Sequence, residues 1–304
     1  MNPPSKDRLI FFGTDAFSLP SLVKLIAEKW HIVAVVTKPD SRMGRGRELS
    51  APAVKKLAVS ANIQVLQPAR LSEIEGELRS LRPDAGIVVA YGKIIRPAIL
   101  DLFPKGLVNV HASLLPKYRG ASPIEAAIKN GDEVTGVTLM KLDHGMDTGP
   151  TYAADKLQLA GTETRPDLYA KLAEMGAKLL SGKLPAILSG NIVSIPQDSA
   201  QASHVGLIKK ADGRVDWTKP ADAIEREIRA YLGWPGSYTK INGTPVTITA
   251  SHISPKDGEP GTAYISPSSE LAVYANMSSL IIDRLTPAGK REMTGIEFLA
   301  GHNV

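Results

Sequence analysis

Short apolar runs alternate with helical patterns through the first half of the chain, and this alternation constrains the fold most strongly. Runs typical of buried strands lie at residues 9–12, 31–37, 63–66, 84–90, 107–111 and 134–141. Helical patterns lie at 19–27, after an expected cap at Ser50, and at 123–130 and 164–189. Such alternation predicts right-handed crossovers and a mostly parallel sheet covered on both faces. We therefore expect an α/β domain over residues 1–190.

The pattern changes after residue 190. Residues 191–205 carry Pro196 and several polar residues, and we expect them to form a linker. A helix at 221–232 then precedes apolar runs at 237–241, 246–253, 271–275 and 279–285, with a final strand or turn at 295–299. Asn242-Gly243 between two alternating runs predicts a hairpin. About five short strands within residues 206–304 favour a small open barrel, of which the OB-fold is the usual instance.

Composition excludes several classes of protein. The chain has 304 residues, which is long enough for two domains, and no cysteine, which excludes disulfides, thiolate nucleophiles and thiolate zinc sites. The N-terminus lacks a secretory apolar core and no segment is apolar enough to span a bilayer, so we expect a cytoplasmic protein. A net charge of +5 makes a polyanionic partner plausible.

Asn109, His111 and Asp147 are the candidate chemical groups. Asn109 and His111 stand two apart in a predicted strand, so their side chains share one face. Asp147 lies between Gly145 and Gly149 in a predicted tight loop. An amide and an imidazole could stabilise an oxyanion, and a carboxylate could orient the imidazole or accept a proton.

Each of these residues also has an ordinary interpretation. His111 could be a satisfied buried histidine, Asn109 a turn residue, and the glycine-flanked loop a simple turn. His144 and Asp143 are alternative choices for the imidazole and the carboxylate.

A glycine–arginine stretch at 41–48 suggests contact with a nucleic acid. Arg42, Arg45 and Arg47 alternate with glycine, and no Lys-Ser/Thr pair of a phosphate loop follows. The stretch could bind an RNA backbone or end, or it could be a solvated, mobile basic loop. Lys209 and Lys210 lead into the second domain, whose predicted fold often binds oligonucleotides on one face.

Several motifs together resemble a known family. They are Asn109 to Pro116, Tyr118-Arg119-Gly120-Ala121-Ser122-Pro123, Gly145 to Gly149, Phe12-Gly13-Thr14, Lys38-Pro39-Asp40, Gly44-Arg45-Gly46, Val88 to Gly92 and Asp212 to Trp217. These residues are similar to the signature of the 10-formyltetrahydrofolate-dependent formyltransferases. The arginine stretch and the second domain resemble the branch that acts on methionyl-tRNA. Met43 and Leu232-Gly233-Trp234-Pro235 depart from the usual pattern, and neither touches the proposed triad.

The resemblance implies a Rossmann-like first domain and an OB-like second domain. It also implies direct transfer of a formyl group from 10-formyltetrahydrofolate to the α-amino group of initiator methionyl-tRNA, without a metal. The implied catalytic triad is Asn109, His111 and Asp147. The implied folate-binding residues are Ser113, Leu114, Leu115 and Pro116, with Val88, Val89, Ala90 and Tyr91 lining the pterin pocket. The implied acceptor-arm loop is 39–49, with Arg45 as its key residue.

Two other functions stay open from the sequence. The same triad could formylate a sugar amine or a glycinamide nucleotide, or hydrolyse formylfolate. Alternatively, the chain could be a non-catalytic RNA-binding protein. For the favoured function we expect a monomer with no obligate protein partner and no membrane attachment.

Overall fold

The computed structural model describes residues 6–43 and 48–302, and the side chains of residues 42, 43 and 48 are not described. The chain forms two compact units. Unit 1 comprises residues 1–123, 135–157 and 169–205, and unit 2 comprises residues 124–134, 158–168 and 206–304. None of the described helices is both long enough and apolar enough to cross a membrane.

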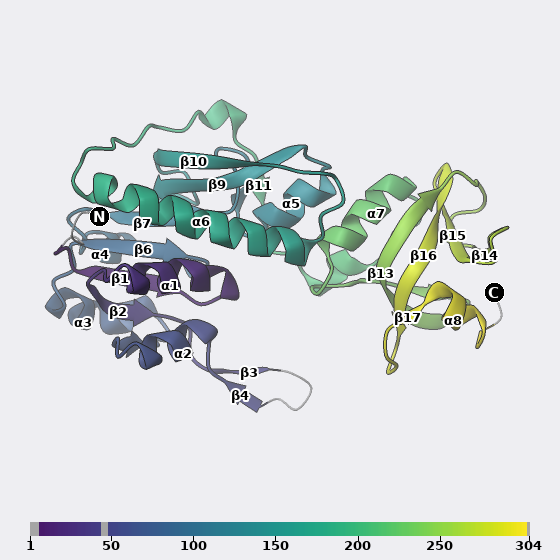
Figure 1. Cartoon of the computed structure of the whole chain (residues 1–304), viewed down its shortest axis with the longest axis horizontal. Helices are drawn as coiled ribbons and strands as arrows, with labels where there is room; N and C mark the ends of the chain where they lie inside the picture. Colours follow the sequence, from purple (N-terminus) through teal and green to yellow (C-terminus); the bar gives the residue numbers. More distant parts are fainter. Residues whose placement is uncertain (1–5, 44–47, 303–304) are drawn as a thin grey trace. The chain divides into compact units, whose positions relative to one another are not determined.

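Unit 1 is built on a seven-stranded sheet (Figure 1). Its strands, in spatial order, are β10 (Thr151–Gln158), β9 (Val134–Lys141), β7 (Leu107–His111), β6 (Ala85–Val89), β1 (Leu9–Gly13), β2 (Ile32–Val36) and β5 (Val65–Leu66). The five strands from β7 to β5 are parallel, whereas β9 runs antiparallel to β7. The expected mostly parallel α/β sheet is confirmed. The sequence analysis missed β10 and did not foresee the reversed direction of β9.

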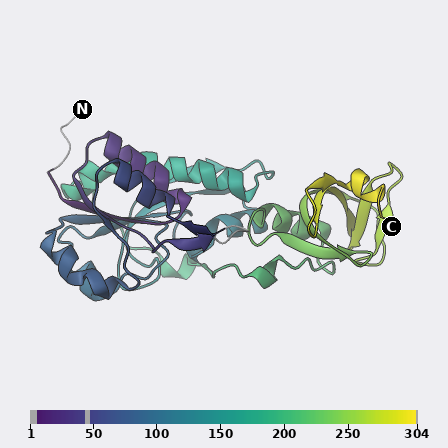
Figure 2. The ribbon, with the colours of Figure 1, turned by 90° about the horizontal axis from the view of Figure 1, so that it is seen from below.

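Helices cover both faces of this sheet (Figure 2). One face is covered by α1 (Leu19–Ala27), α2 (Ala53–Ser60) and α6 (Arg165–Leu188), and the other by α3 (Glu75–Ser80) and α4 (Pro97–Leu100). Short 3-10 turns precede two of these helices, namely η1 (Ala16–Ser18) and η2 (Leu71–Ile74). The expected cap at Ser50 is wrong. Pro52 holds the cap position of α2 with no side-chain hydrogen bond, because Ser50 already belongs to a strand.

That strand is part of a short antiparallel pair within the predicted basic loop. β3 (Ser41–Met43) pairs with β4 (Glu48–Ser50), and Ser41 lies opposite Ser50. Arg42 therefore lies on a strand. Arg45 and Arg47 lie outside the described residues.

Unit 2 contains a curled antiparallel sheet (Figure 1). Its strands are β12 (Ser237–Ile241), β13 (Thr244–Ser254), β16 (Ser278–Pro287), β15 (Leu271–Ala275), β14 (Ala263–Ile265) and β17 (Met293–Thr294). The Asn242-Gly243 hairpin joins β12 to β13 as predicted. Helical segments are α5 (Pro123–Lys129), η4 (Lys210–Gly213), α7 (Ala221–Ala230) and α8 (Gly295–Leu299). The small barrel-like second domain is confirmed, but residues 295–299 form a helix capped by Thr294 rather than a strand or turn.

Tyr91 packs inside the apolar core of unit 1. Its ring meets Phe12 edge to face at 5.6 Å between centroids, and the side chain is 2% exposed. The hydroxyl is buried and has no hydrogen-bond partner among the described residues. Burial raises the pKa of the Tyr91 phenol to about 12. The hydroxyl therefore costs desolvation energy without a compensating bond.

We expect Tyr91→Phe to leave the free energy of unfolding unchanged or raise it by up to about 1 kcal/mol, because it removes an unpaired buried hydroxyl. Tyr169→Phe is the matched control, since the Tyr169 hydroxyl accepts the main-chain N–H of Phe17 at 2.7 Å. That control should lower the free energy of unfolding by about 1 kcal/mol in urea titrations. Equal losses in the two variants would contradict this assignment.

The raised pKa of Tyr91 adds a dependence on pH. An unfolded tyrosine ionises near pH 10, whereas folded Tyr91 ionises near pH 12. The unfolded state therefore binds fewer protons in this window, and the wild-type free energy of unfolding should fall between these pH values. Tyr91→Phe should show a smaller fall.

Candidate active site

The candidate site lies at the carboxyl end of β7. Asn109 and His111 are 9% and 6% exposed, and in register Asn109 lies opposite Val88 of the neighbouring strand β6. From β1 the chain goes first to β2 on one side and later to β6 on the other. Ligands bind beyond the strand ends at such a reversal in an open α/β sheet. The site is thus on the strand next to this reversal.

One carbonyl fixes the tautomer of His111. The ring atom Nε2 lies 2.9 Å from the main-chain oxygen of Tyr118. Because a carbonyl can only accept, Nε2 carries a hydrogen and donates it. The other ring nitrogen, Nδ1, lies 3.7 Å from Oδ2 of Asp147. In the neutral ring Nδ1 is therefore the only nitrogen that can take up a proton.

The Asp147 carboxylate is positioned by three contacts. Oδ2 accepts the main-chain N–H of Gly120 at 2.8 Å and faces His111, and Oδ1 lies 3.5 Å from Nδ2 of Asn109. Asp147 itself has a φ of 53°, which is an unusual backbone for a residue with a side chain. The structure thus brings the three predicted catalytic residues together.

Gln197 holds the Asp147 loop in place, and the sequence analysis missed it. Its amide nitrogen donates to the carbonyls of Asp147 at 2.9 Å and Gly149 at 2.7 Å. Its amide oxygen accepts from Nε and Nη2 of Arg119, at 3.0 and 2.9 Å. Arg119 is 4% exposed, so this fork anchors the loop from inside the unit.

The segment expected to be a linker thus supports the site. Besides Gln197, it contains β11 (His204–Val205), which pairs with β8 (Arg119–Gly120). A Cβ added at Gly120 would lie 2.1 Å from the Val205 carbonyl, so only glycine permits this close pairing. No sequence motif marks Gln197, although Arg119 stands within a quoted motif.

The predicted folate segments follow β6 and β7. Their side chains differ in access: Ser113, Val89 and Tyr91 are at most 2% exposed, and Val88 is also buried. The Ser113 carbonyl accepts the Thr138 hydroxyl at 2.7 Å. Ala90 is exposed, and Leu114, Leu115 and Pro116 are partly exposed. The residues able to touch a ligand are therefore Ala90 and the stretch 114–116.

The alternative catalytic residues have other surroundings. Asp143 accepts the Thr148 hydroxyl at 2.8 Å and the main-chain N–H of Gly145 at 3.0 Å, which shapes the turn. His144 is exposed. Within residues 6–43 and 48–302, no three His, Asp or Glu side chains are placed to hold a metal ion.

The two predicted RNA-binding lysines of unit 2 differ in their contacts. Lys210 donates to the Pro235 carbonyl at 2.6 Å and lies 4.9 Å from the Tyr238 ring centroid. Lys209 and Lys210 are both exposed. They differ in that the Lys210 ammonium is already held by a carbonyl and lies beside an aromatic ring.

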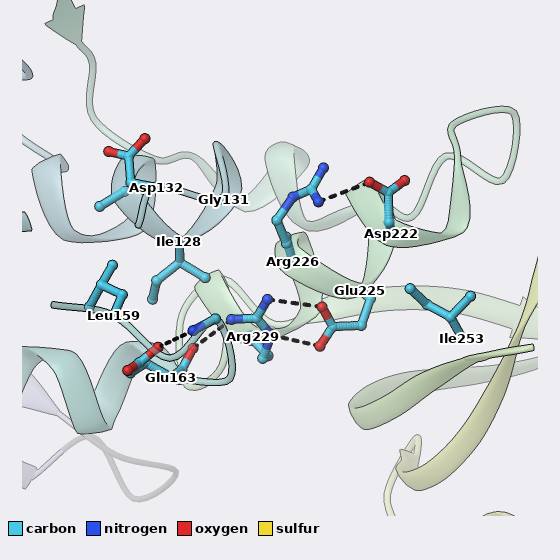
Figure 3. Close-up of a pocket in the computed structure, with 12 residues that line it drawn as sticks. Ile128, Gly131, Asp132, Leu159, Glu163, Asp222, Glu225, Arg226, Arg229 and Ile253 are labelled. Carbon is cyan, nitrogen blue, oxygen red and sulfur yellow. Dashed lines mark hydrogen bonds and ion pairs between the residues drawn. The ribbon is translucent and has the colours of Figure 1, made fainter. Parts of the chain in front are cut away.

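Unit 2 also contains a hollow of about 270 Å³ (Figure 3). Its two arginines are each paired with a carboxylate: Arg226 with Asp222 at 2.9 Å, and Arg229 with Glu225 at 2.6 Å. Arg229 also donates to the Glu163 carbonyl at 2.8 Å. These cations are already neutralised, so the hollow does not present a free site for phosphate.

Comparisons with known proteins show the family of the chain. The family model "Formyl transferase" matches residues 7–184, and "Formyl transferase, C-terminal domain" matches residues 207–303. The methionyl-tRNA formyltransferase of Myxococcus xanthus is 42% identical over 302 residues, covering 99% of this chain and 96% of that protein.

Solved structures share the fold at low sequence identity. An N-formyltransferase from Helicobacter canadensis, solved with folinic acid and dTDP-3-aminofucose, has a TM-score of 0.69 at 21% identity and covers 90% of this chain and 98% of its own. HypX from Aquifex aeolicus has a TM-score of 0.68 at 15% identity, covering 98% of this chain but only 49% of HypX. The two family models and the 42% identity to the Myxococcus xanthus protein show that the chain belongs to the formyl transferase family, among the methionyl-tRNA formyltransferases.

Proposed function

We propose that this chain transfers the formyl group of 10-formyltetrahydrofolate to the α-amino group of methionyl initiator tRNA. Relatives named for this activity match nearly the whole chain at about 40% identity. The observation that carries the chemistry is the convergence of Asn109, His111 and Asp147 at the end of β7. The proposal places the reaction in the cytoplasm and needs no second protein chain.

The amine attacks the formyl carbon directly in this mechanism. An α-amine has a reference pKa of about 7.7–8.0 and is appreciably neutral near physiological pH, so no covalent enzyme intermediate is needed. Holding the two substrates in line supplies roughly 7–11 kcal/mol of the barrier. The enzyme's main tasks are therefore positioning and stabilisation of charge.

Asn109 and His111 stabilise the oxyanion that forms on the formyl oxygen. Asn109 donates through its amide. Since Nε2–H of His111 is held by Tyr118, the ring donates through Nδ1–H, which requires the protonated ring. The Asp147 carboxylate lies 3.7 Å from Nδ1 and orients the ring. The charge-assisted bond is stronger than a neutral one.

The protons balance without a lasting change to the enzyme. As the new C–N bond forms, the amine loses a proton to Asp147. The bond between the formyl carbon and N10 then breaks, and N10 takes the proton from Asp147. The Asp147 carboxylate ends the cycle ionised, and the products are formylmethionyl-tRNA and tetrahydrofolate.

Both substrates have candidate binding residues. Ala90 and residues 114–116 are accessible beyond β6 and β7, which supports folate binding there. The β3–β4 segment, with Arg42, Arg45 and Arg47, together with Lys209 and Lys210, would bind the RNA backbone. Because each of these basic groups would contact phosphate, tRNA binding should weaken as salt rises.

A substrate panel tests the proposed function. The purified full chain is incubated with 10-formyltetrahydrofolate and, in turn, with charged initiator tRNA, an amino sugar nucleotide, glycinamide ribonucleotide or water alone. We expect N-formylmethionine on the tRNA and little turnover with the others. Preferred turnover of the sugar nucleotide, or no folate-dependent activity, would overturn the proposal.

Loss of one oxyanion donor should slow turnover strongly. We expect Asn109→Ala and His111→Ala to lower kcat by about a hundredfold to a thousandfold, because each removes a donor used in the transition state. The KM for the tRNA should change little. Near-normal kcat in a folded His111→Ala variant would refute the assigned role.

Gln197 should act as a positioning residue. Gln197→Ala frees the carbonyls of Asp147 and Gly149 and removes the acceptor for Arg119. We expect kcat to fall by about 10- to 100-fold through misplacement of Asp147, with KM for both substrates nearly unchanged. Gln197→Glu is the informative partner, because it keeps an acceptor for Arg119 but cannot donate to the two carbonyls. If Gln197→Glu kept wild-type kcat, the positioning role would be wrong.

A further inference from the structure

Lys38 lies just beyond the carboxyl end of β2, where three strand ends meet. Its main-chain N–H donates to Oγ1 of Thr14 at 3.3 Å, and that hydroxyl donates to the Tyr91 carbonyl at 3.2 Å. Thr14 follows β1 and Tyr91 follows β6. Lys38 is thus tied to the point where the strand order reverses, which is the usual ligand position in such sheets.

The main chain of Lys38 is held from its other side as well. Its carbonyl accepts from Nε2 of Gln67 at 2.9 Å, and Gln67 also donates to Asp40 at 2.7 Å. Asp40 is paired with Lys55 at 2.8 Å. The backbone at Lys38 is therefore fixed, and the nearby Asp40 carboxylate is already occupied.

The ammonium of Lys38 has no such partner. The side chain is half-buried, and among the side chains that the structure describes none pairs with its Nζ. By contrast, Lys93 donates to two carbonyls and Lys105 pairs with Asp7. The Lys38 Nζ lies against Gly92, where an added Cβ would be 2.6 Å away. A half-buried ammonium that none of the described carboxylates neutralises attracts an anion.

We propose that Lys38 binds a backbone phosphate in the single-stranded 3′ end of the tRNA; this inference rests on the proposed function. β2 is three strands from β7, which corresponds to roughly 14–15 Å. Stacked nucleotides rise about 3.4 Å each, so up to four of them span that distance. With the methionyl amine at Asn109, a phosphate a few nucleotides back reaches Lys38.

Two observations favour RNA over a carboxylate of the folate. Lys38 leads directly into the β3–β4 segment, which carries the arginines proposed to bind RNA. The accessible residues proposed for folate follow β6 and β7, on the other side of β1 from Lys38. Both observations favour a phosphate, and not a folate carboxylate, at Lys38.

The test compares Lys38→Gln with Lys38→Arg and with Lys178→Gln. Lys178 is exposed on α6 and provides the same change of charge on a helix that covers a sheet face. Binding of initiator tRNA to the full chain is titrated between 50 and 200 mM salt, and KM is measured for formylfolate. We expect Lys38→Gln to weaken tRNA binding about tenfold and to lower the salt slope by about 0.7. Lys38→Arg and Lys178→Gln should remain close to wild type.

Results that contradict the role of Lys38 can be distinguished from results that contradict the proposed function. Unchanged tRNA affinity and salt slope in folded Lys38→Gln would overturn the inference alone, if the wild type still formylates methionyl-tRNA. A raised KM for formylfolate with unchanged tRNA affinity would assign the ammonium to folate and overturn it too. A wild type that does not formylate methionyl-tRNA would remove the proposed function, and this inference with it.

Discussion

The Asp147 carboxylate is the group on which the rest of the site depends. It accepts the Gly120 N–H, lies beside Asn109, and faces the one ring nitrogen of His111 that Tyr118 leaves available. A partly buried carboxylate is tolerated when N–H groups satisfy it. Its donors come from Asn109 on β7 and Gly120 on β8. The three groups therefore converge only when the main sheet is formed, β8 is paired with β11, and Gln197 is bonded to the Asp147 carbonyl. In the proposed mechanism, the groups that stabilise the reaction are then in place before either substrate binds.

Much of the fold followed from local pattern. Continuous apolar runs marked the strands β1, β2, β5, β6 and β7, and Asn242-Gly243 marked a hairpin. The misses have physical reasons. β10 lies at the sheet edge and is largely exposed, so it lacks an apolar pattern. The five residues of α8 are too few to show a helical period. The direction of β9 depends on how the chain returns to the sheet after β7, and the apolar residues of β9 do not indicate this.

Only some residues of the site could be predicted from the sequence. Strand spacing placed Asn109 and His111 on one face, but it left Asp143 open as an alternative to Asp147, and the family resemblance favoured Asp147. Gln197 could not be found this way, because it contacts Asp147 from 50 residues further along the chain and belongs to no periodic pattern. Lys38 stood within a quoted motif, yet only the structure shows that its ammonium lies beside Gly92 and pairs with no side chain in the described part of the chain. Spacing along a strand predicts which side chains lie on the same face. Contacts between residues far apart in the sequence, such as that of Gln197 with Asp147, are visible only in the structure.

The protonation of the His111 ring tests the central claim most directly. Nitrogen NMR of the folded enzyme, labelled at histidine, reports the state of each ring nitrogen as pH changes. Our account predicts that Nε2 carries a hydrogen, held by the Tyr118 carbonyl, and that Nδ1, which faces Asp147, carries the second hydrogen of the protonated ring. A neutral ring with its hydrogen on Nδ1 would contradict the account, because Nε2 would then not donate to the Tyr118 carbonyl.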